Sequence, residues 1–211
     1  MDMYTTLHAY AKVNLSLGVG PLGSDGYHPV EMVLCSVDLY DTLRLGIAGR
    51  GITVKTDVPD LPVDAGNIAH RAAAAYLRAV GIAEGVDIEI RKDIPIAAGL
   101  AGGSADAGAV LLGLQRLFGD PLSPDALLDI GADLGSDVPF CLTGGLALAA
   151  GRGTELKPLP PLDEGPVLVI VNPGIPLSTG DVYARFDKLP HGPWPDTAGL
   201  IGALGRADWQ G

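Results

Sequence analysis

Apolar and polar residues alternate along much of the first half of the chain. Val13, Leu15 and Leu17 occupy every second position of one such stretch, and this period of two is typical of a strand with one buried face. A continuous apolar run at 167–171 instead indicates a strand that is buried on both faces. We therefore predict strands over residues 5–19 (one strand or two), 30–45, 52–55, 86–90, 144–150 and 167–171.

Helical spacing of apolar residues marks four other segments. Asn67 is a suitable cap for a helix over 68–80 that ends at Gly81, because Asn accepts an N-terminal N–H and Gly readily adopts the left-handed C-cap conformation. Ser123 and Pro124 start a helix that runs to 132 or 134. Further helices are predicted over 107–118 and, from Thr179 or Asp181, over a short segment with Val182, Tyr183 and Phe186; loops are predicted over 21–28, 58–66 and 134–141.

The order of these elements is strands, helix, strand, two helices and further strands. Such an order is an α+β layout rather than a regular alternation of strands and helices. A change in composition near Gly151 and Gly153 suggests a domain boundary. The part that follows this boundary has only about sixty residues, which is small for an independent domain.

Composition and charge restrict the possible partners. The chain has 211 residues, of which 47% are hydrophobic and 18% charged, with a net charge of −11. An acidic protein without clustered Lys and Arg is a poor ligand for nucleic acid, so no nucleic-acid partner is expected. No run of eighteen apolar residues and no basic start followed by an apolar core is present, so we expect neither a membrane span nor a signal peptide, and a cytoplasmic location.

The segment from Pro95 to Asp106 is the strongest candidate for a ligand site. It holds Gly99, Gly102 and Gly103 between a predicted strand and a predicted helix. Backbone N–H groups at the start of a helix bind anions, and glycines let a phosphate approach the backbone closely. The alternative is a tight turn with Ser104 or Asp106 as the helix N-cap. Three glycines in five residues exceed what a cap needs, so we favour a cradle for a nucleotide triphosphate.

Two common nucleotide motifs are excluded. The glycine-rich segment lacks the Gly-Lys-Ser/Thr ending of a Walker A loop. Residues 18–23 match the G-x-G-x-x-G pattern of dinucleotide-binding proteins. However, turn residues and no helical pattern follow them, and that fingerprint requires a helix.

Three further groups of polar residues are candidates for chemistry. Lys12 and Asn14 lie on one face of a predicted strand, which taken alone is more typical of a solvated edge strand. Tyr27 and His28 end a turn, where they either contact a planar base or are simply exposed. Asp137 precedes an apolar segment, and Pro139 is expected to keep Val138 extended, which would hold the Asp137 carboxylate at the edge of the core. The alternative, favoured when this segment is taken alone, is that Asp137 forms an Asx-turn.

Together these segments resemble those of the GHMP kinases. The resemblance rests on four motifs in this order: the Lys-x-Asn strand at 12–14, the Asp-Gly-Tyr-His turn at 25–28, the Pro-x-x-x-Gly-Leu-x-Gly-Gly-Ser loop at 95–104 and Gly-Ser-Asp-Val-Pro-Phe at 135–140. It implies an α+β fold of two domains. An N-terminal α/β sandwich like domain 2 of ribosomal protein S5 would span 1–152 and hold the ATP and catalytic sites, and 153–211 would begin a C-terminal α+β domain.

The resemblance also implies a role for each candidate residue. Lys12 and Asp137 would be catalytic, with Asp137 as general base and Lys12 stabilising charge. Asn14, Tyr27, His28 and Tyr183 would bind a small-molecule substrate that carries a cytidine diphosphate group. Ser104 would lie near a Mg²⁺ ion, and Asn67 would border the adenine. The phosphates of ATP would contact a continuous run: Pro95, Ile96, Ala97, Ala98, Gly99, Leu100, Ala101, Gly102, Gly103, Ser104 and Ala105.

One departure from the family pattern leaves alternatives open. The family carries a third, Gly-Ser-Gly motif in its C-terminal domain, and this motif is missing from the present 211 residues. We therefore expect a C-terminal domain that is incomplete here. The alternatives are another GHMP kinase of small molecules, acting for instance on mevalonate or homoserine, an inactive nucleotide-binding fragment, and a structural α+β domain. A monomer and a homodimer are equally compatible with the sequence.

Overall fold

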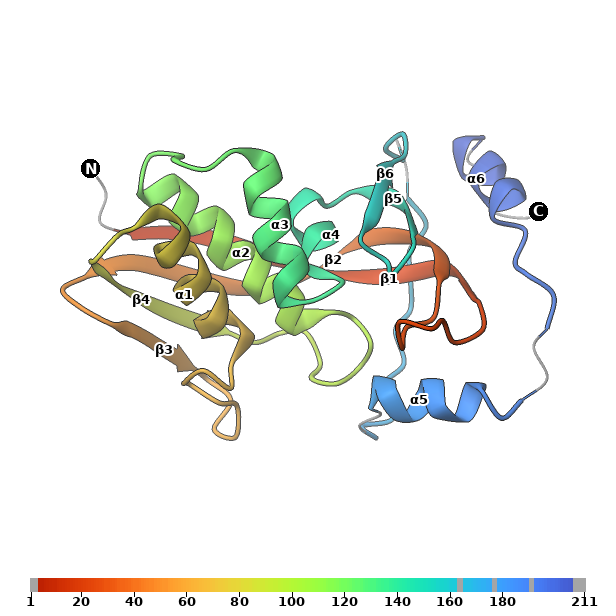
Figure 1. Cartoon of the computed structure of the whole chain (residues 1–211), viewed down its shortest axis with the longest axis horizontal. Helices are drawn as coiled ribbons and strands as arrows, with labels where there is room; N and C mark the ends of the chain where they lie inside the picture. Colours follow the sequence, from red (N-terminus) through yellow and green to blue (C-terminus); the bar gives the residue numbers. More distant parts are fainter. Residues whose placement is uncertain (1–3, 163–164, 176–177, 190–191, 207–211) are drawn as a thin grey trace. The chain divides into compact units, whose positions relative to one another are not determined.

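The computed structural model describes residues 4–162, 165–175, 178–189 and 192–206 (Figure 1). Its strands are β1 (Tyr4–Val19), β2 (Val30–Ala48), β3 (Ile52–Thr56), β4 (Gly85–Arg91), β5 (Leu146–Ala150) and β6 (Glu155–Pro158). Its helices are α1 (Ile68–Val80), α2 (Gly102–Leu117), α3 (Pro124–Leu134), α4 (Val138–Thr143), α5 (Thr179–Phe186) and α6 (Thr197–Gly205). The α+β layout expected from the sequence is confirmed.

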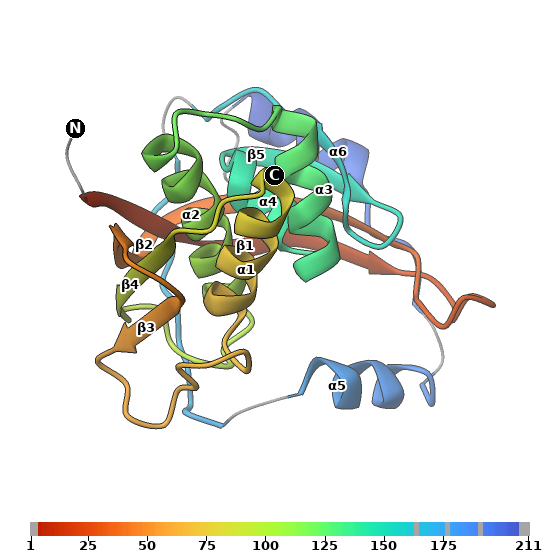
Figure 2. The ribbon, with the colours of Figure 1, turned by 60° about the vertical axis from the view of Figure 1, so that its left-hand side comes forward.

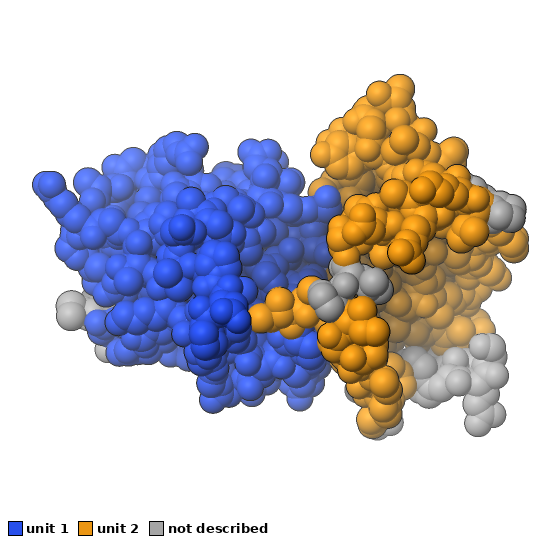
Figure 3. All heavy atoms as spheres, turned by 90° about the horizontal axis from the view of Figure 1, so that it is seen from below, with its two compact units in different colours: residues 1–11, 37–95, 100–143 blue, residues 12–36, 96–99, 144–211 orange. Residues whose placement is uncertain are grey.

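The chain forms two compact units, coloured separately in Figure 3. Unit 1 comprises the described residues of 1–11, 37–95 and 100–143, and unit 2 those of 12–36, 96–99 and 144–211. Each unit therefore draws on several separate stretches of sequence.

Unit 1 is a sheet covered by helices. In it β4 lies between β3, to which it is parallel, and the second half of β2, to which it is antiparallel, so that Ile88 of β4 is opposite both Val54 and Leu45. A parallel pair requires a crossover connection, and α1 supplies it. The helices α1 to α4 lie on one face of this sheet (Figures 1 and 2).

Helix α2 is the central helix of unit 1. Most of its residues between Ala105 and Gln115 are buried, which is the mark of a helix with neighbours on several sides. Small residues permit this packing. A β-carbon at Gly108 would lie 3.3 Å from Cys141 of α4, and one at Gly113 would lie 2.8 Å from Leu7 of β1. The glycines of α2 are therefore places where other elements approach its backbone.

The helix signals read from the sequence are confirmed at three helices. The Asn67 side chain accepts the N–H of Ala69 at 2.9 Å, and α1 ends at Gly81 with φ of 72°. The Ser123 hydroxyl accepts the N–H of Ala126 at 3.2 Å at the start of α3. The short helix expected near residue 180 is α5. The loop at 21–28 is followed by a strand and not by a helix, as expected if the G-x-G-x-x-G match at 18–23 is a chance one.

Unit 2 contains a small meander. The first half of β2 pairs antiparallel with β5, and β5 pairs antiparallel with β6 through a turn in which Gly151 and Gly153 both have positive φ. Leu204 of α6 packs with Val33 and Leu146 in the buried centre of this unit. The sequence signal after residue 188 was too weak to predict α6.

Three sequence predictions are wrong in detail. Residues 138–143 form α4 rather than a loop, and Val138 is helical although Pro139 follows it; Pro is tolerated in a first helical turn, where its missing N–H would have no partner. Helix α2 begins at Gly102 rather than at 107. The run at 167–171 is not a buried strand: Val167, Val169 and Val171 are each more than four-fifths exposed, because no described strand pairs with them.

The close approach between β4 and the turn before β3 predicts a strong effect on stability. A β-carbon at Gly85 would overlap the carbonyl oxygen of Gly51 and the carbonyl carbon of Arg50, which are backbone atoms and cannot move aside as the end of a flexible side chain can. We expect Gly85→Ala to lower the free energy of unfolding by about 2–3 kcal/mol. Gly49→Ala is the control, since a β-carbon there meets nothing within 4 Å. Equal midpoints of urea unfolding for the two variants would contradict this prediction.

Candidate active site

The N-terminus of α2 differs from those of four other helices. Side chains of Asn67, Ser123, Ser178 and Asp196 cap α1, α3, α5 and α6. The cap residue of α2 is Ala101, and no described side chain donates to or accepts from this end of the helix as a cap. The alternative that Ser104 or Asp106 is the N-cap is therefore wrong. The first N–H groups of α2 are left for another acceptor, such as an anion.

The loop before α2, residues 95–101, is called the glycine loop below. Its backbone changes hand repeatedly, with positive φ at Ala97 (55°), Gly99 (75°) and Ala101 (58°). Left-handed residues in a loop can turn successive N–H groups toward one side, which is how many loops bind anions. Two of the three left-handed residues are alanines, for which this conformation is unfavourable. Such strain is most often found at functional sites.

Two segments of unit 1 approach Ile68, the first residue of α1. A β-carbon at Gly103, in the first turn of α2, would lie 3.4 Å from the Ile68 side chain, and one at Gly135 would lie 3.9 Å from it. Gly135 lies two residues before Asp137. The start of α2 and the segment that carries Asp137 are therefore neighbours.

Asp137 precedes α4 directly. Its carbonyl oxygen accepts the N–H of Cys141 at 3.1 Å, which places Asp137 at the N-terminal end of that short helix. The residue is half-buried, whereas Val138 and Phe140 after it are buried in the core of unit 1. The hydrophobic anchor of α4 thus fixes the backbone from which the carboxylate projects.

Asn67 has its polar atoms engaged in local structure. Its side-chain oxygen caps α1, and its side-chain nitrogen donates to the carbonyl oxygen of Pro62 at 2.8 Å. The residue is 7% exposed. A role of this residue beside the adenine, implied by the resemblance, would therefore depend on how it shapes the preceding loop.

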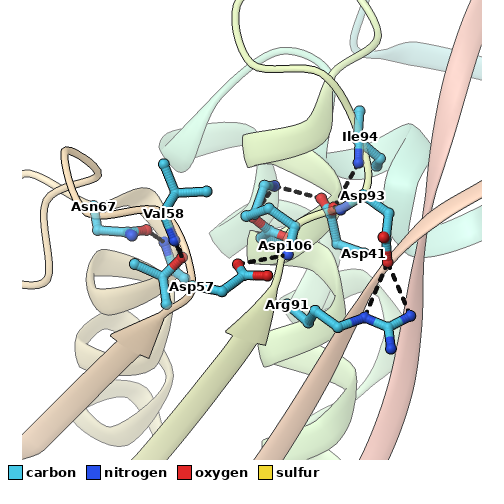
Figure 4. Close-up of polar contacts among 11 residues, drawn as sticks. Asp41, Asp57, Val58, Asn67, Arg91, Asp93, Ile94 and Asp106 are labelled. Carbon is cyan, nitrogen blue, oxygen red and sulfur yellow. Dashed lines mark hydrogen bonds and ion pairs between the residues drawn. The ribbon is translucent and has the colours of Figure 1, made fainter.

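A buried network of charges was not foreseen from the sequence. The Lys92 ammonium donates to Asp41 and, at 2.7 Å, to Asp106 Oδ2, and the side chains of all three residues are at most 5% exposed. Figure 4 shows the network between the end of β4 and α2. Burial raises the pKa of Asp106 to about 7, although Lys92 opposes this shift, and the two carboxylates raise the pKa of Lys92 against its own burial.

Lys12 and Asn14 lie together on β1 in unit 2. Lys12 Nζ donates to Asn14 Oδ1 at 2.9 Å, so the two side chains share one face of the strand as expected. Lys12 is only 6% exposed. The interpretation of this residue as part of a solvated edge is therefore wrong. Burying an ammonium is costly unless charged or polar groups surround it, so the burial of Lys12 favours a functional role.

His28 is held between several groups of unit 2. Its Nδ1 lies 2.9 Å from the carbonyl oxygen of Gly20, which only accepts, so Nδ1 carries a proton. Its ring stacks on Tyr183, with centroids 4.9 Å apart, and Nε2 lies 3.5 Å from Asp187. The structure thus brings together His28 and Tyr183, two residues far apart in the sequence that were both expected to bind substrate.

Tyr27 points to a different neighbour. The Arg152 guanidinium lies 3.8 Å from the centre of the Tyr27 ring, and the same guanidinium donates to Asp25 at 3.1 Å. Tyr27 is 51% exposed. Its ring is thus held by a cation on one side and is accessible to solvent elsewhere.

The described residues hold no cluster of three or more His, Cys, Asp or Glu side chains that could bind a metal ion. Ser104, in the first turn of α2, is half-buried. Mg²⁺ in nucleotide-dependent enzymes is held mostly by phosphates and water, with few protein ligands. A single hydroxyl beside an anion site fits such an ion.

Within the described residues, no helix has the length and apolar character needed to cross a membrane.

Comparisons with known proteins identify the family of this chain. Residues 67–145 match the GHMP kinases N terminal domain. The chain is similar to the 4-diphosphocytidyl-2-C-methyl-D-erythritol kinases of Clostridium tetani, with 41% identity over 95% of this chain and 71% of that protein, and of Shouchella clausii, with 45% identity over 98% and 69%. A crystal structure of 4-(cytidine 5'-diphospho)-2C-methyl-D-erythritol kinase matches with a TM-score of 0.76 at 35% identity, over 97% of this chain and 72% of that one.

Proposed function

The chain belongs to the GHMP kinase family, among its 4-diphosphocytidyl-2-C-methyl-D-erythritol kinases, and we propose on this basis that it phosphorylates 4-diphosphocytidyl-2-C-methyl-D-erythritol. The γ-phosphate of ATP would pass to the 2-hydroxyl of this substrate, giving the 2-phosphate and ADP in the non-mevalonate route to isoprenoid precursors. The observation that carries the proposal is the extent of similarity, 41% identity over 95% of the chain.

The glycine loop and the first turn of α2 would hold the phosphates of ATP. The absence of a side-chain cap among the described residues and the positive φ of Ala97, Gly99 and Ala101 support this assignment. Phosphoryl transfer depends mainly on alignment and on stabilising charge. A set of backbone N–H groups that is already oriented stabilises that charge without reorganising.

Asp137 would be the general base and Lys12 the residue that stabilises charge. As the acceptor oxygen bonds to the γ-phosphorus and the bond to the β–γ bridging oxygen breaks, the hydroxyl proton passes to the Asp137 carboxylate. The Lys12 ammonium offsets the negative charge that develops on the attacking oxygen. The burial of Lys12 strengthens its electrostatic effect, because a low local dielectric screens charge less than water does.

Mg²⁺ would accompany ATP, with Ser104 as its protein ligand. The ion supplies neutralisation of charge on the β- and γ-phosphate oxygens when it is bound. The Ser104 hydroxyl suits this role because it lies in the first turn of α2, where the phosphates are expected.

His28, Tyr183, Tyr27 and Asn14 would bind the cytidine part of the acceptor. The stacked pair of His28 and Tyr183 supports this assignment, since an aromatic face and an imidazole edge suit a planar base. The exposed Tyr27 ring offers a second aromatic face on which the base could stack.

The proposal is tested by ADP release with purified protein, ATP and Mg²⁺, using the cytidyl substrate, mevalonate and homoserine in parallel. We expect turnover with the cytidyl substrate alone. Turnover only with mevalonate or homoserine would assign the chain to a different kinase of the family. Binding of ATP without turnover on any acceptor would favour a nucleotide-binding role for these 211 residues.

The stacked pair predicts a loss of acceptor affinity in one variant. We expect Tyr183→Ala to raise KM for the cytidyl substrate about tenfold, because stacking of a base on an aromatic ring contributes about 1–3 kcal/mol. KM for ATP should not change. Tyr10→Ala is the control, since Tyr10 is a tyrosine of unit 1 that is 46% exposed. Equal acceptor KM values for the two variants would remove Tyr183 from the substrate site.

A further inference from the structure

The two ends of the glycine loop are joined by one buried network, made of Asp41 on β2, Lys92 after β4 and Asp106 on α2. The glycine loop itself contributes no side chain to this network. The network therefore acts on the glycine loop through the backbone on either side of it.

Asp41 holds the start of the loop. Its Oδ1 accepts the backbone N–H of Asp93 at 2.6 Å and of Ile94 at 2.8 Å, the two residues before Pro95. Its Oδ2 accepts from the Lys92 ammonium. Asp41 is fully buried, so these charge-assisted bonds are not weakened by competition with water.

Lys92 carries the connection to the other end of the loop. Its ammonium donates to Asp106 Oδ2 in α2, five residues after the loop ends at Ala101. A β-carbon at Gly102 would lie 3.1 Å from the Ile94 side chain and 3.5 Å from Lys92 Nζ. The start of α2 therefore rests directly on the residues that precede the loop.

The backbone of Lys92 is fixed as well. Its N–H donates at 3.0 Å to Oδ1 of Asp57, which lies just after β3. Asp57 opens the loop that leads to Asn67 and α1. The network thus connects the glycine loop with the segment proposed to border the adenine.

Stability alone explains this network poorly. It places two carboxylates around one ammonium, and Asp106 Oδ1 is buried without a hydrogen-bond partner among the described residues. Replacing buried ion networks by apolar side chains is often neutral or stabilising. What such groups provide in some proteins is one defined geometry, because an ion pair with directed hydrogen bonds has few alternative arrangements.

We propose that Asp41, Lys92 and Asp106 are positioning residues, which hold the two ends of the glycine loop at the separation that the ATP phosphates require. The functional half of this inference rests on the proposed function, in which the loop binds ATP. The mechanical half, that the network restrains the loop, does not depend on it.

Asp106→Leu is the informative variant. It disconnects α2 from the network but leaves Lys92 paired with Asp41, so no lone charge is buried. Asp106→Asn should restore the connection, because an amide oxygen still accepts from Lys92. Gln115→Leu is the matched control: Gln115 is a buried polar residue of the same helix, bonded to Tyr76 at its other end. If Asp106→Leu does not fold, Asp106→Ala replaces it, because this variant also leaves Lys92 paired with Asp41.

Two measurements separate the halves of the inference. In Asp106→Leu we expect amide hydrogen exchange over 95–105 to be about tenfold faster, as local opening becomes easier, with α3 unchanged. We also expect KM for ATP to rise about tenfold and KM for the cytidyl substrate to stay within about twofold. Asp106→Asn and Gln115→Leu should resemble the unmodified protein in both measurements.

Unchanged exchange over 95–105 in Asp106→Leu would overturn the inference. Faster exchange with an unchanged KM for ATP would overturn its functional half. If the unmodified protein neither binds nor hydrolyses ATP but Asp106→Leu still loosens 95–105 selectively, the proposed function fails and the mechanical half is supported. If Gln115→Leu raised the exchange rate over 95–105 and KM for ATP as much as Asp106→Leu, the effect would be a general one on α2. This result would also overturn the inference.

Discussion

Asp137→Asn is expected to lower kcat by about 10³-fold while leaving KM for ATP nearly unchanged. An amide of the same size fits the same position at the start of α4, so folding should be unaffected. It cannot accept the proton of the acceptor hydroxyl, and the attacking oxygen must then lose its proton to water. The measurement is steady-state ADP release at saturating cytidyl substrate, together with direct titration of ATP binding.

Asp133→Asn is the appropriate control for this result. Asp133 is an exposed carboxylate on α3, four residues earlier in the chain, so its replacement changes the net charge equally. It should retain the turnover of the unmodified protein. If Asp137→Asn did so as well, another group would be the base, and the role of Asp137 would be limited to the backbone of α4.

Lys12→Met is expected to reduce kcat by about 10²–10³-fold, the usual effect of removing one group that stabilises charge in the transition state. Methionine fills a similar volume on β1 and removes the cost of burying an ammonium, so the free energy of unfolding should not fall. A loss of turnover without a loss of stability separates a catalytic lysine from a structural one.

The control for Lys12 is Lys55→Met. Lys55 is an exposed lysine on β3, and we expect its replacement to leave kcat within about twofold of the original. A parallel loss of stability and activity in Lys12→Met would instead mean that its hydrogen bond to Asn14 supports the fold. Lys12 would then have no direct part in the reaction.

The helices with clear chemical signals were predicted well from the sequence. Asn67 and Gly81 delimit α1, and Ser123 with Pro124 starts α3, because a helix end needs a partner for its backbone and few residue types supply one. Helix α4 was missed, since it has six residues and Pro139 near its start suggested an extended chain. The run at 167–171 is apolar, but an apolar run becomes a buried strand only where another strand or helix covers it.

The candidate site was predicted in part. The glycine loop was found because its unusual density of glycine signals a backbone site. The pairing of His28 with Tyr183 could not follow from spacing, since 154 residues separate them and only the family resemblance linked them. The buried network was missed for a different reason. Asp106 lies among the small and apolar residues of α2, where it would be unfavourable without a partner, but nothing in the local sequence indicates that the partner is Lys92.

The packing of α2 has a consequence for protein engineering. Exchanging helical glycines for alanine is a standard way to raise thermal tolerance, because it restricts the unfolded chain. In α2 this strategy should fail at Gly113, where the added methyl group would come within 2.8 Å of Leu7, and would have little room at Gly108. Searches for heat-tolerant forms should therefore avoid this helix and begin with open positions such as Gly49, where a methyl group has space.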